Sequence, residues 1–159
     1  MLPSMLLLAA VQAHAGSCSV SSSGLVFGAY HPLTFAGKLN SSAVTSNATI
    51  SVVCTGISSS SSAYSIALGP SITGSNDRIG TRYLSNSLGG EDMVFNIYTD
   101  ANFSTVWGNG TTGGLVGGSI PAGDSNQSQA VYGRIAAGQN TLKIGTFSGA
   151  LTMTLTYNP

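Results

Sequence analysis

Apolar and polar side chains alternate with a period of two along much of the chain. In the last stretch three threonines alternate with four apolar or aromatic residues, Leu151, Met153, Leu155 and Tyr157. The same alternation occurs in three earlier segments, at Ile50, Val52 and Cys54, at Tyr64, Ile66 and Leu68, and at Met93, Phe95 and Ile97. Because successive side chains of a β-strand point to opposite faces, this pattern predicts a half-buried strand in each segment.

Turn-forming residues separate these segments, and no window has the period of an amphipathic helix. The turn-rich stretches are 58–62, 69–70, 74–77, 89–90, 108–118 and 121–126. Short strands divided in this way predict an all-β, antiparallel β-sandwich. The serine-rich stretch 58–62 and the glycine-rich stretch 108–118 are too short to separate domains, so we expect loops there.

The beginning of the chain has the pattern of a secretory signal. An apolar run from Met5 to Val11 precedes Ala13-His14-Ala15, an A-x-A cleavage pattern, although no Lys or Arg comes before the run. We therefore expect residues 1–15 to be a signal peptide and residues 16–159 to form one exported domain. The run is shorter than the ~20 residues that span a bilayer, and no membrane span is expected in the rest.

Charged residues are unusually few. They make up 6% of the 159 residues, with a net charge of 0, whereas roughly 25% is typical of soluble domains. Five scattered basic residues form no cluster that would bind nucleic acid or an anionic membrane. A net charge near zero also weakens the repulsion between copies, which favours a structural or polymeric role.

The chain contains two cysteines, Cys18 and Cys54. In an oxidising compartment a single pair has one possible intramolecular connectivity, so export predicts a Cys18–Cys54 disulfide. A redox function is not expected, because catalytic dithiols usually lie close together in the sequence.

Catalytic and metal-binding patterns are weak. After removal of the signal one histidine remains, His31, and no nucleophile elbow surrounds any serine. The acidic residues are dispersed and match no metal-ligand spacing. Residues 108–113 fit the G-x-G-x-x-G dinucleotide pattern, but the glycines that follow are unsuited to opening a helix. We therefore expect no metal, no cofactor and no enzymatic activity.

Several motifs, in their order and spacing, resemble the spore coat protein U family, which includes the pilins of archaic (Csu-type) chaperone–usher pili. These motifs are Cys18-Ser-Val, 26–32 (VFGAYHP), 52–54 (VVC), 64–68 (YSIAL), 95–100 (FNIYTD), 106–110 (VWGNG), 131–135 (VYGRI) and 151–157 (LTMTLTY). The resemblance covers nearly all of residues 16–159. One departure is 148–150 (SGA), where the family often has an Asp before the last strand.

The resemblance implies an immunoglobulin-like sandwich that lacks one strand and is completed by a donor strand. A periplasmic chaperone, an outer-membrane usher and neighbouring pilin subunits are the implied partners, and the cell surface is the implied destination. Leu151, Met153 and Leu155 are candidates for one wall of the donor-strand groove. The alternative is that they form ordinary core in a self-complete coat protein of a spore or cell.

Two further expectations concern the position of the subunit and its adhesion. Gly16 and Ser17 alone separate the expected cleavage site from Cys18, whereas a donor strand needs about ten residues. We therefore expect a receiving subunit, either a single-domain tip or coat protein or part of a longer chain. Exposed apolar loop residues are candidate adhesive contacts, with Leu115 and Val116 first and 33–35 and 88–90 next, whereas Trp107 is expected in the core.

Overall fold

A computed structural model describes residues 16–33, 41–58, 62–71 and 78–158. These residues form an antiparallel all-β sandwich, and none of them lies in a helix. The predicted fold class, an all-β immunoglobulin-like sandwich, is thereby confirmed. The predicted signal peptide at residues 1–15 lies outside the described residues.

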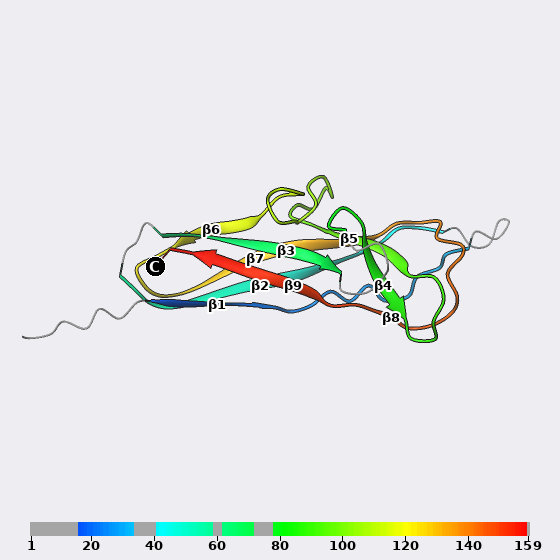
Figure 1. The fold of residues 1–159 in the computed structure, drawn as a ribbon, viewed down its shortest axis with the longest axis horizontal. Helices are drawn as coiled ribbons and strands as arrows, with labels where there is room; N and C mark the ends of the chain where they lie inside the picture. Colours follow the sequence, from blue (N-terminus) through cyan, green and yellow to red (C-terminus); the bar gives the residue numbers. More distant parts are fainter. Residues whose placement is uncertain (1–15, 34–40, 59–61, 72–77, 159) are drawn as a thin grey trace, which may run out of the picture.

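The larger sheet has six strands in the order β1-β2-β7-β5-β4-β8. In this order the strands are β1 (Ser17–Ser22), β2 (Val44–Ile57), β7 (Gly123–Ile135), β5 (Met93–Tyr98), β4 (Arg82–Asn86) and β8 (Phe147–Ser148). All neighbouring strands are antiparallel. The long strands β2 and β7 run along most of the molecule (Figure 1).

The smaller sheet has three strands in the order β6-β3-β9. They are β6 (Val116–Ile120), β3 (Ser62–Ser71) and β9 (Leu151–Tyr157). The last strand of the chain, β9, therefore lies at the edge of its sheet, as β1 does in the larger sheet. Figure 1 shows β1 and β9 side by side along the same side of the sandwich.

The core lies between the two sheets, and the predicted alternating positions of β2, β3 and β5 form part of it. Ile50, Val52 and Cys54 are at most 1% exposed, whereas the intervening Val53 is 41% exposed. The predicted apolar faces of β3 and β5 are also buried, and Trp107 is 1% exposed, as expected. The period of two thus identified which faces of β2, β3 and β5 enter the core.

The predicted disulfide is confirmed. Cys18 in β1 and Cys54 in β2 stand opposite each other in the register and are bonded. Just beyond, the register shifts at Gly56, whose φ of 66° is readily adopted by glycine and whose N–H donates to Asp124 Oδ1 (2.9 Å). The disulfide therefore fixes the edge strand β1 to its neighbour β2 in the larger sheet.

Several predicted turns are wrong, wholly or in part. The stretch 69–70 was expected to be a turn, but it lies inside β3, whose register with β9 shifts between Leu68 and Ser71. The stretch 108–118 was expected to be a loop, but β6 begins at Val116 and pairs with β3 as far as Ile120. The stretch 121–126 was expected to be a turn, but β7 begins at Gly123. At the beginnings of β6 and β7, pairing with a neighbouring strand outweighs the low strand propensity of Gly, Asn and Asp.

Candidate functional site

The seam between β1 and β9 is closed at one end. Among the described residues, β9 pairs only with β3, and β1 pairs only with β2. At the end of the sandwich that carries the C-terminus, the Cys18 N–H donates to the Tyr157 hydroxyl oxygen at 3.1 Å. This bond joins the two sheets across their facing edges.

Beyond Ser22 the chain separates from β2, and the space between it and β9 widens. The segment 23–33 forms one wall of this space. The last backbone bond to β2 runs from the Ser23 N–H to the Thr49 carbonyl (3.0 Å). The Phe27 ring then packs edge-on against Phe95, with centroids 6.1 Å apart. It also covers Gly133, where a Cβ would come within 2.6 Å of the ring, so the close approach requires a glycine.

Tyr30 anchors the far end of this wall. Its hydroxyl donates to the Ala136 carbonyl (2.7 Å) and accepts the N–H of Gln139 (3.1 Å). The Gln139 side chain in turn bonds both the N–H and the carbonyl of Val94 in β5. The segment 23–33 is therefore held at both ends, while between Gly24 and Ala29 its backbone is not part of a strand.

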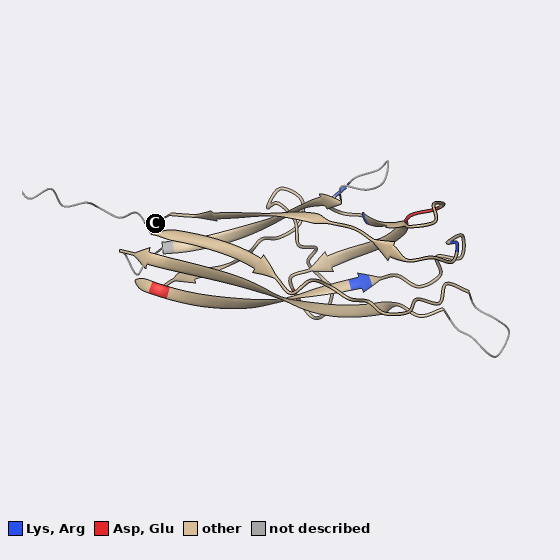
Figure 2. Cartoon of the chain, turned by 90° about the horizontal axis from the view of Figure 1, so that it is seen from below, with Lys and Arg blue, Asp and Glu red and all other residues tan. Residues whose placement is uncertain are grey.

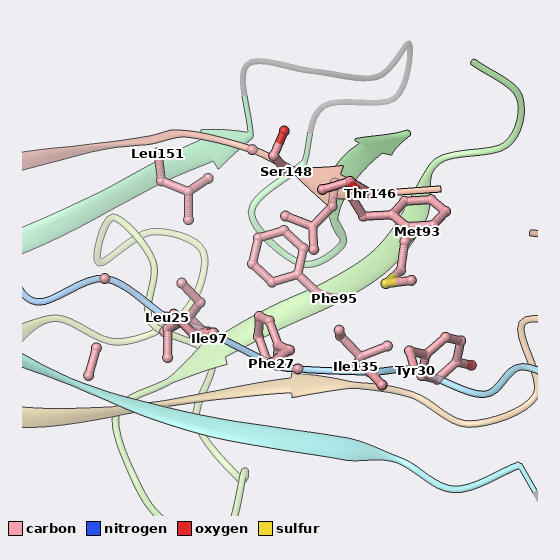
Figure 3. Close-up of a pocket in the computed structure, with 18 of the residues that line it drawn as sticks. Leu25, Phe27, Tyr30, Met93, Phe95, Ile97, Ile135, Thr146, Ser148 and Leu151 are labelled. Atoms are coloured by element: carbon pink, nitrogen blue, oxygen red, sulfur yellow. The ribbon is translucent and has the colours of Figure 1, made fainter. Parts of the chain in front are cut away.

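The opposite wall consists of residues 142–149 and the beginning of β9. Between the two walls lies an open groove of about 980 Å³. Its floor is the apolar core surface of both sheets, formed by Ala48, Ile50, Leu68, Leu84, Met93, Phe95, Ile97, Trp107, Val131 and Ile135. Figure 3 shows Leu151 reaching into this groove from one side and Leu25 and Phe27 lying on the other.

The groove is almost free of charge, and its rims are apolar. Lys143 is the one lining residue with a permanently charged side chain in the described part of the chain. On the rims, Val26 is 83% exposed and Ile144 is 94% exposed. A concave apolar surface of this size, with apolar residues on both rims, is typical of a site that another chain covers.

The three groove residues nominated from the sequence do not all have the same position. Leu151 and Met153 line the groove, whereas Leu155 lies further along β9, outside it. All three are only partly buried and pack against the core, and the threonines between them are exposed. The apolar face of β9 is therefore directed inward but is only partly covered.

Sequence reasoning did not identify the wall formed by Leu25, Phe27 and Tyr30 as part of the groove. The apolar run from Leu25 to Phe27 was available as a signal, but it does not show that this segment leaves its neighbouring strand. The exposure of the rim residues Val26 and Ile144 could not be predicted from the local sequence, because it depends on whether another strand lies beside them.

The predicted adhesive pair is only half exposed. Leu115 is 44% exposed, but Val116 is 6% exposed, so the expectation that Val116 lies on an exposed loop is wrong. Val116 is the first residue of β6 and pairs with Ile66, which turns its side chain into the core. Leu33 and Leu88 are 55% and 77% exposed, whereas residues 34 and 35 lie outside the described ranges.

Other kinds of site find no support in the described residues. No group of three or more His, Cys, Asp or Glu side chains is placed to hold a metal ion there. His31 lies exposed in the segment 23–33. The G-x-G-x-x-G stretch forms a tight loop in which Asn109 Oδ1 accepts the N–H groups of Thr111 and Thr112, and the chain then enters β6.

No helix within the described ranges combines the length and the apolar character needed to cross a membrane.

Comparisons with known proteins agree with this architecture. A search of curated protein sequences found no match. Among solved structures, the chain is similar to one chain of the crystal structure of the CsuC–CsuE chaperone–tip adhesion subunit pre-assembly complex from archaic chaperone–usher Csu pili of Acinetobacter baumannii. The TM-score is 0.54 and the identity 13%.

That match covers 89% of this chain and 40% of the other, so the present chain spans less than half the length of its structural relative. The likeness shows the fold, and the open seam is consistent with an incomplete immunoglobulin-like sandwich. A family model describes the sequence more directly, because the Spore Coat Protein U domain model matches residues 4–154. The predicted family is confirmed: the chain belongs to the Spore Coat Protein U domain family.

Proposed function

We propose that this protein is a non-enzymatic subunit or tip domain of a surface pilus, assembled by chaperone–usher donor-strand complementation. The single observation that supports the proposal most strongly is the groove of about 980 Å³ between the segment 23–33 and β9. In this proposal the chain passes through the periplasm and functions at the cell surface in adhesion or biofilm formation. Leu115 remains a candidate adhesive contact.

The geometry of β9 supports insertion of a strand. One edge of β9 is paired with β3, and no described strand pairs with its other edge. A donor strand laid along that edge would bond the free N–H and C=O groups of β9 and present alternate side chains to the groove floor. Each fully buried apolar side chain of the donor contributes about 1.5–3 kcal/mol.

The groove also indicates the chemistry of the donor. Its floor is apolar throughout, and Lys143 lies on a wall and not on the floor. A charged side chain directed at that floor would lose its hydration without gaining a partner. The donor strand should therefore alternate apolar residues facing the groove with polar residues facing solvent.

Two donors in succession are proposed. A periplasmic chaperone would first cover the groove, and a neighbouring subunit would then replace the chaperone strand at the outer-membrane usher. The solved relative is described as a chaperone–tip adhesion subunit pre-assembly complex, and the shared fold supports the same type of partner here. An unprotected groove of this kind would otherwise promote aggregation.

The test is periplasmic co-expression with a cognate pilus chaperone, using a matched pair of variants in β9. Met153→Arg places a charge in the groove, whereas Thr154→Arg places the same charge on the exposed face of the same strand. We expect wild type and Thr154→Arg to co-purify with the chaperone and Met153→Arg to lose at least ~90% of the complex. Disulfide content of the remaining protein checks that the variant folds.

The opposite outcome is also well defined. If the wild-type chain is equally soluble and monomeric without any chaperone, and no complex is recovered, then donor-strand completion is wrong. That result would favour a self-complete coat protein.

A further inference from the structure

A second concave site lies on the face of the larger sheet that is turned away from the groove. Neighbouring residues of β7 point to opposite faces, so Val131 and Ile135 contribute to the groove while Tyr132 faces the other side. There a hollow of about 300 Å³ is lined by Thr45, Ser46, Asn47, Phe103 and Tyr132. The proposed pilus function does not use this hollow.

The sheet register places aromatic and polar side chains in rows across three strands. Asn47 of β2, Tyr132 of β7 and Tyr98 of β5 stand opposite one another in one row. Thr45 and Arg134 form the next row on the same face, two residues along each strand. The hollow therefore combines aromatic rings with an amide and a hydroxyl, and the cation of Arg134 belongs to a row beside it.

Phe103 reaches the hollow from the loop that follows β5, and its backbone is strained. Its φ of 56° lies in the left-handed region, which a bulky residue rarely adopts. Its ring stands edge-on to Tyr98, with centroids 5.5 Å apart. Strain of this kind persists when the surroundings hold it in place, and it occurs preferentially at functional sites.

Asp100 holds this loop in shape. Its carboxylate accepts the backbone N–H groups of Thr105 (2.8 Å), Asn102 (3.0 Å) and Ser104 (3.2 Å). The bond from Thr105, assisted by those from Ser104 and Asn102, holds the pKa of Asp100 below its ordinary value, against the opposing effect of desolvation. The negative charge of Asp100 is therefore directed at its own loop.

Arg134 supplies a positive charge beside the hollow. Its guanidinium carbon lies 5.5 Å from the centroid of the Phe103 ring, within the range of a cation–π contact. The side chain is exposed. The whole chain has five Lys and Arg residues, and Figure 2 shows how sparsely charged residues are distributed over the fold.

We propose that this hollow binds a saccharide unit that carries a carboxylate, namely a hexuronic acid residue of an acidic glycan. The C–H face of a pyranose ring packs on aromatic rings, and the Asn47 amide and the Thr45 hydroxyl suit its hydroxyl groups. The exposed guanidinium of Arg134 matches the carboxylate, with which arginine forms paired charge-assisted hydrogen bonds. A volume of about 300 Å³ lies at the lower end of small-molecule sites, which fits one sugar unit.

The test uses the full chain, alone or in complex with its chaperone, in calorimetric titrations with two matched ligands. One ligand is an oligogalacturonate, and the other is a neutral galactose oligomer of the same length, which lacks the carboxylates. Three variants are compared: Arg134→Gln removes the charge, Phe103→Asn removes the ring but tolerates the left-handed backbone, and Lys143→Gln is a charge-matched control on the groove wall.

We expect saturable binding of the oligogalacturonate, at least ~10-fold weaker binding in Arg134→Gln and Phe103→Asn, and unchanged binding in Lys143→Gln. Thermal unfolding of each variant separates loss of binding from loss of fold. The proposal is overturned if the wild type binds neither ligand at millimolar concentration, if it binds both equally, or if Arg134→Gln binds as well as Lys143→Gln. None of these outcomes depends on whether a donor strand fills the groove.

Discussion

The two halves of the sandwich hold their sheets together by different means. In the half near the C-terminus the edge strands meet directly, because the Cys18 N–H bonds the Tyr157 hydroxyl and Cys18 is covalently linked to β2. In the other half the edges part and the groove opens between them. The first half is closed by contacts between edge strands, whereas the second must be held by contacts elsewhere.

Arg82 provides those contacts in the open half. This fully buried side chain of β4 donates to the carbonyls of Leu68 (3.0 Å) and Gly69 (2.9 Å) in β3, on the opposite sheet. It also donates to the Trp107 carbonyl (2.8 Å) and to Asn96 Oδ1 (2.6 Å). The Trp107 indole N–H adds a bond to the Ile66 carbonyl (2.8 Å).

The comparison explains how an incomplete sandwich can keep an open groove. An apolar cavity without support favours collapse of its walls onto each other, because collapse buries apolar surface. Buried directional bonds between β4 and β3 fix the spacing of the sheets in the open half. The groove can then stay open, as the proposed insertion of a donor strand requires.

The largest expected effect is the loss of this buried polar connection. Arg82→Met retains much of the length of the side chain but removes every donor, leaving buried carbonyl oxygens without their guanidinium partner. We expect the free energy of unfolding to fall by about 3–5 kcal/mol, measured by urea denaturation. Arg78→Met is the matched control, because Arg78 is exposed, and its effect should lie within ~0.5 kcal/mol.

If Arg82→Met were as stable as Arg78→Met, the open half would have to be held by apolar packing alone. A second measurement sharpens the result. Hydrogen exchange in Arg82→Met should accelerate most at the end of β3 around Leu68, and less at β1, where the sheets are joined by a different bond.

The buried sides of β2, β3, β5 and β9 could be predicted from the sequence, but the hydrogen bonds that join the two sheets could not. Alternation identified Ile50, Ile66 and Phe95 correctly because burial in a strand depends on a local period of two. Arg82 bonds oxygen atoms from three segments that are separate in the sequence. A local sequence pattern does not predict that such segments come together around one side chain. For the same reason β6 was missed: Gly117 and Gly118 have low strand propensity, and their strand exists because β3 pairs with it.

The groove was predicted through family resemblance and not through local pattern. The residues nominated for it came from β9, where an alternating face is visible in the sequence. The opposite wall at Leu25 and Phe27 forms because the chain leaves β2 after Ser23, which is a feature of tertiary structure. The loop prediction for Val116 was wrong, because a glycine-rich segment can still form a strand when a neighbouring strand pairs with it.

The next largest effect is expected in the closed half. Replacing both cysteines with alanine removes a crosslink between residues separated by 36 positions, which restricts the unfolded chain. On the chain-entropy account the free energy of unfolding should fall by about 3–4 kcal/mol. Wild type measured in reductant should unfold at the same urea concentration as the double variant.

A stability that did not depend on reductant would show that the β1–β2 hydrogen bonds alone secure the edge strand. The comparison between the halves predicts a further difference. Loss of the disulfide should loosen β1 and the beginning of the segment 23–33, whereas the Arg82 contacts between β4 and β3 should retain their protection in hydrogen exchange.

The smallest effect is expected from the single hydrogen bond that closes the seam. Tyr157→Phe keeps the ring that packs against the core but leaves the Cys18 N–H without its 3.1 Å acceptor. The free energy of unfolding should fall by about 1 kcal/mol, the usual net value of one part-buried hydrogen bond. Thr156→Val, which removes a hydroxyl on the exposed face of the same strand, should change stability by less than ~0.5 kcal/mol.

Exchange of the Cys18 amide should accelerate in Tyr157→Phe and not in Thr156→Val. Equal exchange rates in both variants would show that the edge strands are held together by the neighbouring side chains and not by this bond, because only the tyrosine hydroxyl differs at the seam.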